Sequence, residues 1–549
     1  MSMLTFNIKK MKKINLFQKA ACAMGVLLTI GCTDLEETTY SELSESNFYK
    51  TELELVQANL RPFTHMQAWL AWSGQNGYYY HNELSADQTA WPQKGRHGYD
   101  NADHIRQHYH TWTDQEGRLN NAWRLMWTGL GFVNTAIESI EAVDAASIGV
   151  TPERLASIVA EAKVLRAYHY MKIMDMWGNV PIVTTVGEPN NPPTASREEV
   201  FAFIEQELLD NVEKLQPLSP QLIGRMSKAV GYSILSELYL NAEVWSGTPR
   251  WEESITYADK VISGEGGSLT GNIALDQDPL GPFNNTNEDS PENIFQFPFS
   301  RQNDFGYSWA SFYMGFSNMT AALDVNYSGN NAFVVIPTAF NAYQENDIRK
   351  QEWFLFGPQY KFGTEEPILG SEEYNGEPFI YVNNIRRNTE GQTGEGSMTD
   401  GEENSGARFH KYRSGRQEDP NYLEGDYVVY RLTELYFNKA EALMRLNNGN
   451  ATQEAVDLIN ASKVRYFTSD DWADEAYTTT SLTMSELLIE RGREFIFEGK
   501  RRTDLIRFGE FTTGSWWDHE PSGDLNLTIY PIPYRQLQAN PNLVQNPGY

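Results

Sequence analysis

Residues 151–178 read "TPERLASIVAEAKVLRAYHYMKIMDMWG", a segment with both helix ends marked in the sequence. Thr151 suits the N-cap, Pro152 suits the first helical position, and Gly178 favours termination. Apolar residues lie around most of the expected helix: Leu155, Ile158, Val159, Ala162, Leu165, Ile173 and Met174. A helix that is apolar on most faces is buried among other elements, so this segment predicts a helical core.

Further helices are predicted on both sides of this one. Ser196 and Glu199 form the pattern of a capping box at the start of the next helix. Helical periodicity also predicts helices over 227–244, 251–262, 430–446, 452–467 and 483–499, with a short one near 504–508. Successive pairs of about 30 to 35 residues favour tetratricopeptide-like helical hairpins.

Residues 263–430 lose the helical period and are rich in Gly, Asn, Asp, Glu and Pro. Short strand-like runs, "NIFQFPF" at 293–299 and "YVVY" at 427–430, interrupt long loops. The expected fold class is mostly α: a tetratricopeptide-like hairpin scaffold with a loop-rich, partly β ligand-binding insertion. The expected domains are 47–262, 263–430 and 431–549, because loops this long on a rigid scaffold are where binding surfaces are usually built.

The N-terminus has the features of an export signal. A basic stretch at 9–13 precedes an apolar run at 20–30 that is too short to cross a bilayer. Gly31 then provides a small residue before Cys32, which predicts a lipoprotein signal peptide over 1–31 and a lipid on Cys32. A plain secretory signal is the alternative, and translation could start at Met1 or at Met11. Residues 32–46 are expected to form an acidic tether.

The charge balance is strongly acidic, with 44 Lys and Arg against 73 Asp and Glu and a net charge of −29. Removal of the five lysines before Cys32 would make the net charge −34. Such a charge disfavours nucleic acid and anionic lipid surfaces as partners. The only two cysteines are Cys22 and Cys32, so a cleaved chain keeps one and can form no intramolecular disulfide.

Aromatic residues concentrate in two places. Residues 63–127 contain six of the nine histidines and six of the fourteen tryptophans. Trp91 is followed by Pro92 among polar residues, which favours a loop position where a flat ring can stack on a sugar. Trp69 and Trp72 have either that role or local packing. Trp123 and Trp127 have helical spacing and are expected in the core. The second concentration is an aromatic run at 304–316, in which Tyr307 and Trp309 alternate and would share one face of an extended segment.

No metal or catalytic site is expected. The run "HIRQHYH" spaces His104 and His108 like a zinc helix but lacks the glutamate that follows the first histidine in the zinc-protease motif. Acidic loops such as "DQDP" at 276–279 leave Ca²⁺ open. Glu490, Glu494 and Glu498 could serve glycoside chemistry, but the many neighbouring arginines favour an ion-pair lattice between helices.

Several stretches together resemble the SusD/RagB family of Bacteroidetes outer-membrane nutrient-binding lipoproteins. Among them are "EAKVLRAYHYMKIMDMWGNVPIV" at 161–183, "ERGREFIFEGKRRTDLIRFG" at 490–509 and "YPIPYRQLQANPNLVQNPGY" at 530–549, and the matching stretches are spread from Asn47 to Tyr549. The resemblance implies a lipid-anchored surface protein that binds glycans, without a cofactor, for a SusC-like TonB-dependent transporter.

The resemblance also implies where the ligand binds. Family glycan sites use aromatic residues from the loops after the first helices and from the central insertion, which favours Trp91 and Trp309 as stacking residues. The further candidates are Trp69, Trp72, Tyr78, Tyr80 and Tyr307. Two other functions stay open: a peptide-binding importer component of the RagB type, and a surface glycoside hydrolase or lyase.

Overall fold

The computed structural model describes residues 49–70, 76–187, 191–300, 320–326, 329–413, 415–422 and 424–549. By its contacts the chain divides into Met1–Tyr49 and Lys50–Tyr549, and the following description concerns the second unit. The predicted signal peptide, Cys32 and the acidic tether lie outside the described residues, as do Trp72, Tyr307 and Trp309.

Helices make up most of the unit outside the insertion. Those before the insertion are α2 (Glu52–Met66), α3 (Tyr78–Leu84), α4 (Asp103–His108), α5 (Gly117–Glu141), α6 (Pro152–Trp177), α7 (Arg197–Asn211), α8 (Lys228–Leu240), α9 (Ala242–Ser246) and α10 (Trp251–Ile262). Those after it are α14 (Leu432–Leu446), α15 (Gln453–Lys463), α16 (Trp472–Glu475), α17 (Met484–Phe495), α18 (Arg501–Phe508) and α19 (Tyr534–Ala539).

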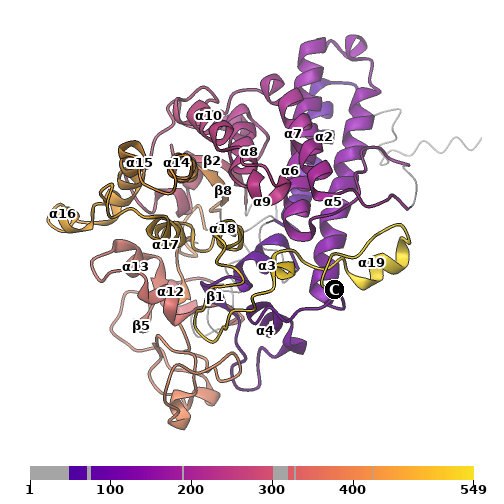
Figure 1. Ribbon diagram of the computed structural model, residues 1–549. Coiled ribbons are helices and arrows are strands. Elements are labelled where there is room, and N and C mark those ends of the chain that lie inside the picture. The colour runs from indigo at the N-terminus through magenta and orange to yellow at the C-terminus, as the bar shows by residue number, and fades with distance from the viewer. Residues whose placement is uncertain are drawn as a thin grey trace, which may run out of the picture. The chain divides into compact units, whose positions relative to one another are not determined.

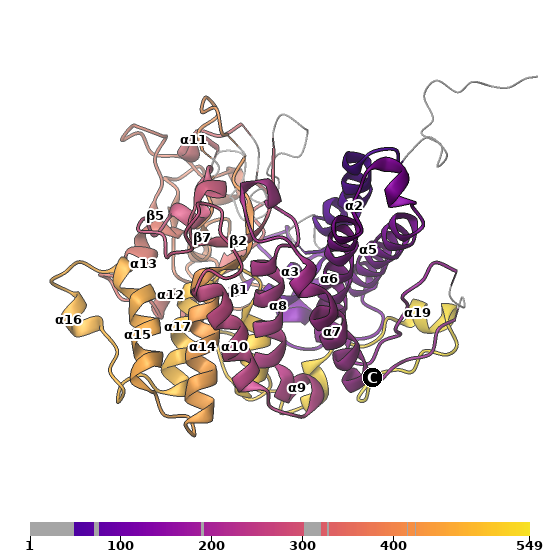
Figure 2. The ribbon, with the colours of Figure 1, turned by 90° about the horizontal axis from the view of Figure 1, so that it is seen from above.

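The long helices pack as neighbours in a row. Contacts join α2 to α5, α5 to α6, α6 to α7, α7 to α8, α8 to α10, α10 to α14 and α14 to α15. Figure 2 shows this row from α2 and α5 at one end to α14 and α15 at the other. The mostly helical fold class is confirmed (Figure 1).

Most predicted helix ends are confirmed by their caps. The hydroxyl of Thr151 accepts the backbone N–H of Arg154 at 3.2 Å, and Gly178 ends α6 with φ of +65°. Ser196 and Glu199 form the predicted capping box at α7. The helix expected over 227–244 is instead divided into α8 and α9 at Asn241.

The insertion contains short elements. Its helices are α11 (Thr320–Leu323), α12 (Pro337–Asn341) and α13 (Ile348–Glu352). Its strands are β2 (Asn293–Phe297), β3 (Val334–Val335), β4 (Phe354–Leu355), β5 (Gly357–Pro358), β6 (Ile380–Tyr381), β7 (Arg408–Phe409) and β8 (Tyr427–Arg431), which ends one residue past it. One further strand, β1 (Thr89–Ala90), lies in the N-terminal region. All pairs are antiparallel: β1 with β3, β2 with β8, β4 with β7 and β5 with β6. Because Tyr430 and Arg431 belong to β8, α14 begins two residues later than the sequence pattern predicts.

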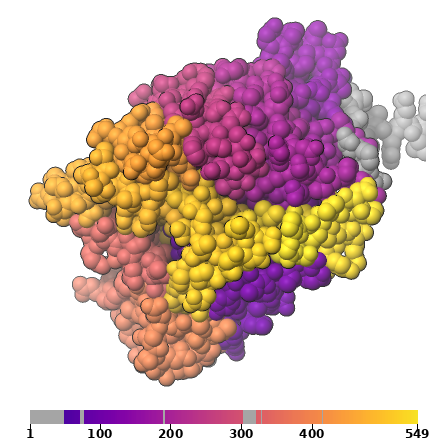
Figure 3. Space-filling model, viewed as in Figure 1, coloured from indigo at the N-terminus to yellow at the C-terminus, as the bar shows by residue number. Residues whose placement is uncertain are grey.

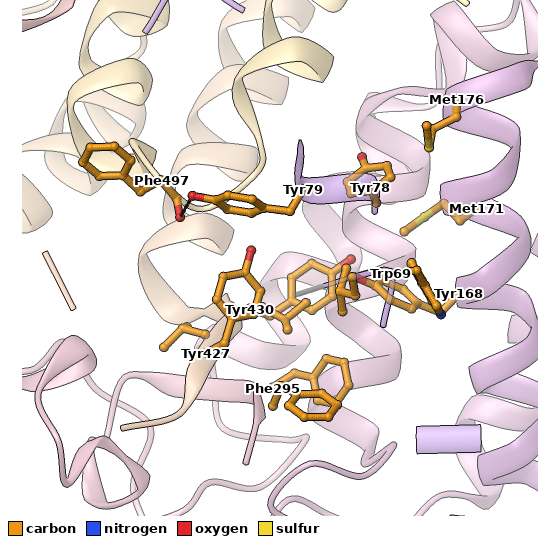
Figure 4. Close-up of a cluster of buried hydrophobic side chains, with 14 of the residues drawn as sticks. Trp69, Tyr78, Tyr79, Tyr168, Met171, Met176, Phe295, Tyr427, Tyr430 and Phe497 are labelled. Carbon is orange, nitrogen blue, oxygen red and sulfur yellow. Dashed lines mark hydrogen bonds between the residues drawn. The ribbon is translucent and has the colours of Figure 1, made fainter. Parts of the chain in front are cut away.

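The core joins residues from distant parts of the chain. The ring of Tyr168 on α6 lies 6.3 Å from that of Trp69 and 6.2 Å from those of Phe295 and Tyr430. Figure 4 shows this cluster, in which the Tyr79 hydroxyl donates to the carbonyl oxygen of Phe497 at 3.1 Å. The first helices, the insertion and the C-terminal helices therefore share one core.

The C-terminal segment, from about residue 509 to 549, packs against the first helices and hydrogen-bonds to them. It crosses the face shown in Figure 3 as a continuous yellow band. The Tyr530 hydroxyl donates to the carbonyl oxygen of His81 at 3.1 Å, and its backbone N–H donates to Met176 at 2.7 Å. The side-chain amide of Asn546 donates to Trp177 at 2.7 Å. Buried hydrogen bonds thus hold the last residues against α3 and α6.

The predicted ion-pair lattice is confirmed. Arg431, whose side chain is 1% exposed, pairs with Glu292, Glu494 and Glu498 at 2.8 to 2.9 Å. Arg349 pairs with Glu490 at 2.8 Å and with Glu494 at 3.1 Å. The carboxylates of Glu490 and Glu494 on α17, and of Glu498 just after it, therefore connect this part of the chain to Arg431 on β8 and to Arg349 in the insertion.

No helix in the described part of the chain is both long enough and apolar enough to span a bilayer.

Candidate functional site

Pairing of β1 with β3 brings two loops together. Thr89 lies opposite Val335 and Ala90 opposite Val334, so the residues that follow β1 run beside those that precede β3. A third segment joins them, because the backbone N–H of Gln93 donates to Met398 at 2.8 Å and that of Gly401 donates to Gln93 at 3.0 Å. Loops of the N-terminal region and the insertion therefore meet at Trp91.

A groove of about 380 Å³, here called the Trp91 groove, lies where these loops meet. Most of its lining carries hydrogen-bonding groups: Trp91, Pro92, Lys94, His97, Gly98, Asp100, Gly329, Asn330 and Asn331. A concave site with one aromatic ring and several polar groups suits a ligand that has both apolar faces and hydroxyls.

One face of the Trp91 ring is already occupied. The ring stacks on His104 with centroids 4.4 Å apart and planes 3° apart, and Phe333 lies 5.6 Å away. His104 donates from Nε2 to the carbonyl oxygen of Gly98 at 2.8 Å, and burial lowers its pKa to about 3. Trp91 is 4% exposed, so it presents only a small part of its ring to the groove. Its contact with a ligand stays a prediction.

Three other expected stacking residues are buried in the core. Trp69 is 0%, Tyr78 4% and Tyr80 1% exposed. The Tyr78 hydroxyl donates to Asp175 at 3.0 Å, and Trp69 contacts the rings of Tyr168 and His169. A ring covered by protein has little face to offer a sugar, so this burial argues against stacking by Trp69, Tyr78 and Tyr80, and their contact with a ligand stays an untested prediction. The predictions for Trp72, Tyr307 and Trp309 fall outside the described residues.

A second, smaller hollow continues the groove. It measures about 70 Å³ and is here called the glutamate pocket; its lining is Lys94, Gly95, His97, Ser371, Glu373, Tyr374, Arg387, Thr389, Glu390, Gly401, Glu402 and Glu403. Lys94 and His97 line both hollows, so the two lie side by side and share part of their walls.

Sequence reasoning missed the glutamate pocket. Glu402 and Glu403 lie in a polar loop more than 300 residues after Trp91, and backbone hydrogen bonds of Gln93 and Gly95 with Met398 and Gly401 bring the two segments together. The sequence feature that could have pointed to this pocket is the pair of adjacent glutamates, Glu402 and Glu403, within the loop-rich insertion.

A larger, mostly apolar hollow lies elsewhere. It has a volume of about 630 Å³ between α5, the loop after α6 and α19. Trp123 and Trp127 line it with ring centroids 5.3 Å apart. Trp123 is buried, as predicted, whereas Trp127 is partly exposed. Most of its lining is aliphatic or aromatic, whereas most of the lining of the Trp91 groove carries hydrogen-bonding groups.

The clustered histidines have structural partners. His108 donates from Nε2 to the carbonyl oxygen of Trp517 at 3.1 Å, and His110 to that of Ser85 at 2.8 Å. Burial lowers the pKa of each to about 3, as it does for His104. Within the described ranges, no three His, Cys, Asp or Glu side chains are arranged to hold a metal ion.

The acidic loop considered for calcium uses its carboxylates internally. Asp276 accepts the backbone N–H of Asp278 at 3.0 Å and the hydroxyl of Ser290 at 2.7 Å. Asp278 accepts the backbone N–H of Leu280 at 3.0 Å. These bonds stabilise the loop itself, and calcium binding there stays an untested prediction.

Packed helical pairs that carry a polar groove built from loops define a class of binding protein. Comparisons with known proteins specify it further. A profile of the SusD family matches residues 291–549, and a profile described as "Starch-binding associating with outer membrane" matches residues 35–240.

Individual relatives match along most of their length. The chain is 26% identical over 512 residues to the starch-binding protein SusD of Bacteroides thetaiotaomicron, covering 87% of this chain and 86% of that protein. A laminarin-binding SusD-like protein shares the fold with a TM-score of 0.67 at 20% identity, over 91% of this chain and all of that one. Surface glycan-binding protein A from Bacteroides thetaiotaomicron, solved with laminarihexaose, has a TM-score of 0.67 at 18% identity, over 90% and 99% of the two chains. The chain belongs to the SusD-like family.

Proposed function

We propose that this protein is a cell-surface glycan-binding lipoprotein that captures oligosaccharide or polysaccharide and delivers it to a SusC-like TonB-dependent transporter in the outer membrane. The observation that carries the proposal is the family match along the chain, since relatives in this family are named for binding starch, laminarin and other surface glycans. The polar Trp91 groove supports it as the binding site.

We propose binding without cleavage. Glu490, Glu494 and Glu498 are the carboxylates whose spacing invited a glycosidase interpretation, and each of them is paired with buried arginines. Burial raises the pKa of the Glu490 carboxyl, but Arg349 and Arg493 together lower it to about 2. A carboxylate held ionised in this way is a poor general acid. New reducing ends released from a bound polysaccharide would contradict this part of the proposal.

The binding test is affinity electrophoresis in gels that contain starch or laminarin, followed by titration calorimetry with the matching oligosaccharides. Trp91→Ala is expected to weaken binding about tenfold through loss of ring contact. Trp91→Phe keeps an aromatic ring stacked on His104, so comparing it with Trp91→Ala distinguishes lost ligand contact from lost packing in the core. Trp309→Ala tests the other residue that the sequence favours for stacking on the glycan.

The control for this test lies in the apolar hollow, where Trp127→Ala should leave glycan affinity unchanged. Loss of binding in Trp127→Ala, with wild-type binding in Trp91→Ala and Trp309→Ala, would move the site to the hollow between α5 and α19. Calorimetry with peptides in place of oligosaccharides distinguishes the peptide-importer alternative from the proposed function. That alternative predicts a heat of binding with peptides and none with oligosaccharides.

A lipid on Cys32 is expected in the protein purified from its own membranes. Intact-mass and N-terminal peptide analysis should find a chain that begins at Cys32 and carries diacylglycerol with a further acyl chain. Cys32→Ala should abolish this mass and release the protein from the membrane fraction. An unacylated N-terminus at Cys32 would contradict the anchor.

A further inference from the structure

Three short segments of the insertion pair with one another and form a closed group, here called the strand triangle. Its segments are 357–361, 366–370 and 377–381, and the first of them contains β5 (Figure 1). The backbone N–H of Gln359 donates to the carbonyl oxygen of Phe379 at 2.9 Å, that of Phe379 to Ile368 at 2.8 Å, and that of Ile368 back to Gln359 at 2.9 Å. Each segment therefore pairs with both of the others, and hydrogen bonds fix the three relative to one another.

The strand triangle has a buried face and an exposed face. Side chains alternate along a strand, and residues directly opposite in an antiparallel pair lie on the same face. The inward side chains, Gln359, Ile368 and Phe379, are at most 8% exposed. The outward ones are the opposed pairs Pro358 with Ile380, Tyr360 with Pro367, and Leu369 with Pro378, and all six are exposed. The triangle thus presents a face of apolar and aromatic side chains to solvent.

Three aromatic rings on or beside this face keep about half of their surface open. Phe356 is 45%, Tyr360 47% and Phe362 49% exposed. The ring of Phe356 packs on that of buried Phe340, with centroids 4.7 Å apart. The guanidinium of Arg416 lies 4.9 Å from the ring centroid of Phe362. Both phenylalanine rings are supported from one side, so a ligand that stacks on them meets a preformed surface.

The turn between the second and third segments of the strand triangle borders the candidate site. Glu373 and Tyr374 of this turn line the glutamate pocket, which shares part of its wall with the Trp91 groove. Glu373 also pairs at 2.5 Å with Arg96, from the loop that carries Trp91. Tyr374 packs on Phe379 of the triangle, with ring centroids 5.4 Å apart. The exposed face is thus one turn of the chain away from the groove proposed for the glycan.

Two other kinds of partner fit this face less well than a glycan does. Residues 354–381 contain one lysine and five glutamates, and this negative charge repels anionic lipid head groups. An extended peptide joins a sheet by pairing with a free edge, but the three segments already pair with one another. Prolines at 358, 367 and 378 also have no N–H to donate to an added strand. An uncharged polymer that stacks on aromatic rings meets neither obstacle.

We propose that the strand triangle is a second glycan-binding surface, on which the rings of Tyr360, Phe356 and Phe362 stack against a polysaccharide that also occupies the Trp91 groove. Sugars have flat apolar faces of the kind that aromatic side chains contact. Two contacts made by one polymer add avidity, so the second surface favours polysaccharides over short oligosaccharides. This inference rests on the proposed glycan-binding function and specifies its ligand as a long chain.

The test variant combines Tyr360→Ala with Phe362→Ala. Both side chains are about half exposed, so their removal deletes ring contacts with little effect on the core. In gels that contain the polymer retaining wild type, starch or laminarin, the affinity of the double variant should fall about tenfold. Its calorimetric affinity for short oligosaccharides, which occupy the Trp91 groove alone, should stay within about twofold of wild type.

The matched control for the double variant is Tyr534→Ala. Tyr534 lies on α19, and it is 42% exposed. This variant should match wild type with both polymer and oligosaccharide, because its ring lies outside the strand triangle and outside the residues that line the Trp91 groove. Midpoints of urea unfolding show that all variants fold.

Unchanged polymer affinity in the double variant would overturn the inference. An equal loss of affinity for short oligosaccharides would overturn it too, because the triangle would then be part of the first site. Wild-type binding to phosphatidylcholine vesicles that the double variant loses, with polymer affinity unchanged, would assign the face to a lipid surface instead. In these three cases wild type still binds glycan, so the proposed function survives. A wild-type protein that binds neither polymer nor oligosaccharide would overturn both proposals.

Discussion

Replacing Arg431 with methionine is expected to lower the free energy of unfolding by about 3 to 5 kcal/mol. The Arg431 guanidinium is shared by Glu292, Glu494 and Glu498, all of which are almost fully buried. Methionine fills similar space but leaves these carboxylates with fewer positive partners. Urea unfolding followed by tryptophan fluorescence measures the change.

The control for Arg431→Met is a surface ion pair. Lys361, 46% exposed, pairs with Glu366, which is 61% exposed. Lys361→Met should change the free energy of unfolding by no more than about 1 kcal/mol, because water and salt screen such pairs. Arg431→Lys should fall between the two, since lysine keeps the charge but not the forked donors. Equal losses of unfolding free energy in Arg431→Met and Lys361→Met would show that the buried lattice stabilises the fold no more than a surface ion pair does.

Glu83→Gln is expected to make the protein more stable than wild type at pH 8. Glu83 is buried; its Oε1 accepts the backbone N–H of Gly499 at 2.8 Å, and its Oε2 finds no donor among the described residues. Burial raises the pKa of its carboxyl from 4.5 to about 8, partly offset by the Gly499 bond and by Lys411. The residue is therefore largely protonated at neutral pH, and glutamine reproduces that form.

The sign of the pH dependence follows from these two pKa values. Between pH 4.5 and 8 the folded state keeps the Glu83 proton that the unfolded chain has released. Stability from this group is thus complete below the unfolded pKa and falls by about 1.4 kcal/mol per pH unit until the folded pKa is reached. The advantage of Glu83→Gln should grow over this range to something on the order of 4 kcal/mol.

Urea unfolding of both proteins at half-unit steps from pH 5 to pH 9 measures this difference. Exposed Glu377→Gln should follow wild type at every pH. Parallel curves for wild type and Glu83→Gln would contradict the raised pKa and show that the Glu83 carboxylate is ionised in the folded protein.

Local signals in the sequence predict the helices well. The caps at Thr151 and Ser196 lie within one turn of the helix they start, and both are formed as expected. The arginine-rich run at 490–507 correctly predicts an ion-pair lattice, because charges at that density need partners when helices pack. The caps depend on neighbours that are close in the chain, whereas the lattice also uses Arg349 and Arg431 from distant segments.

The candidate site was harder to predict because its surroundings come from far away. Trp91, beside proline and polar residues, has the sequence context of an exposed loop, yet His104 and Phe333 cover most of its ring. Tyr78 and Tyr80 lie on a seven-residue helix whose faces are buried by α4, α6 and the C-terminal helices. Composition alone does not distinguish an aromatic ring that binds a ligand from one covered by a distant segment.

The C-terminal band has a consequence for the order of folding. Its hydrogen bond from Tyr530 to His81 spans 449 residues, and the bond from Trp112 to Tyr549 spans 437. Contacts of such long separation form late, because the loop between them must be closed first. The contacts of the C-terminal band with His81 and Trp112 therefore form only after the whole chain has been made. If the chain is the exported lipoprotein proposed above, this delay keeps it unfolded while it crosses a membrane.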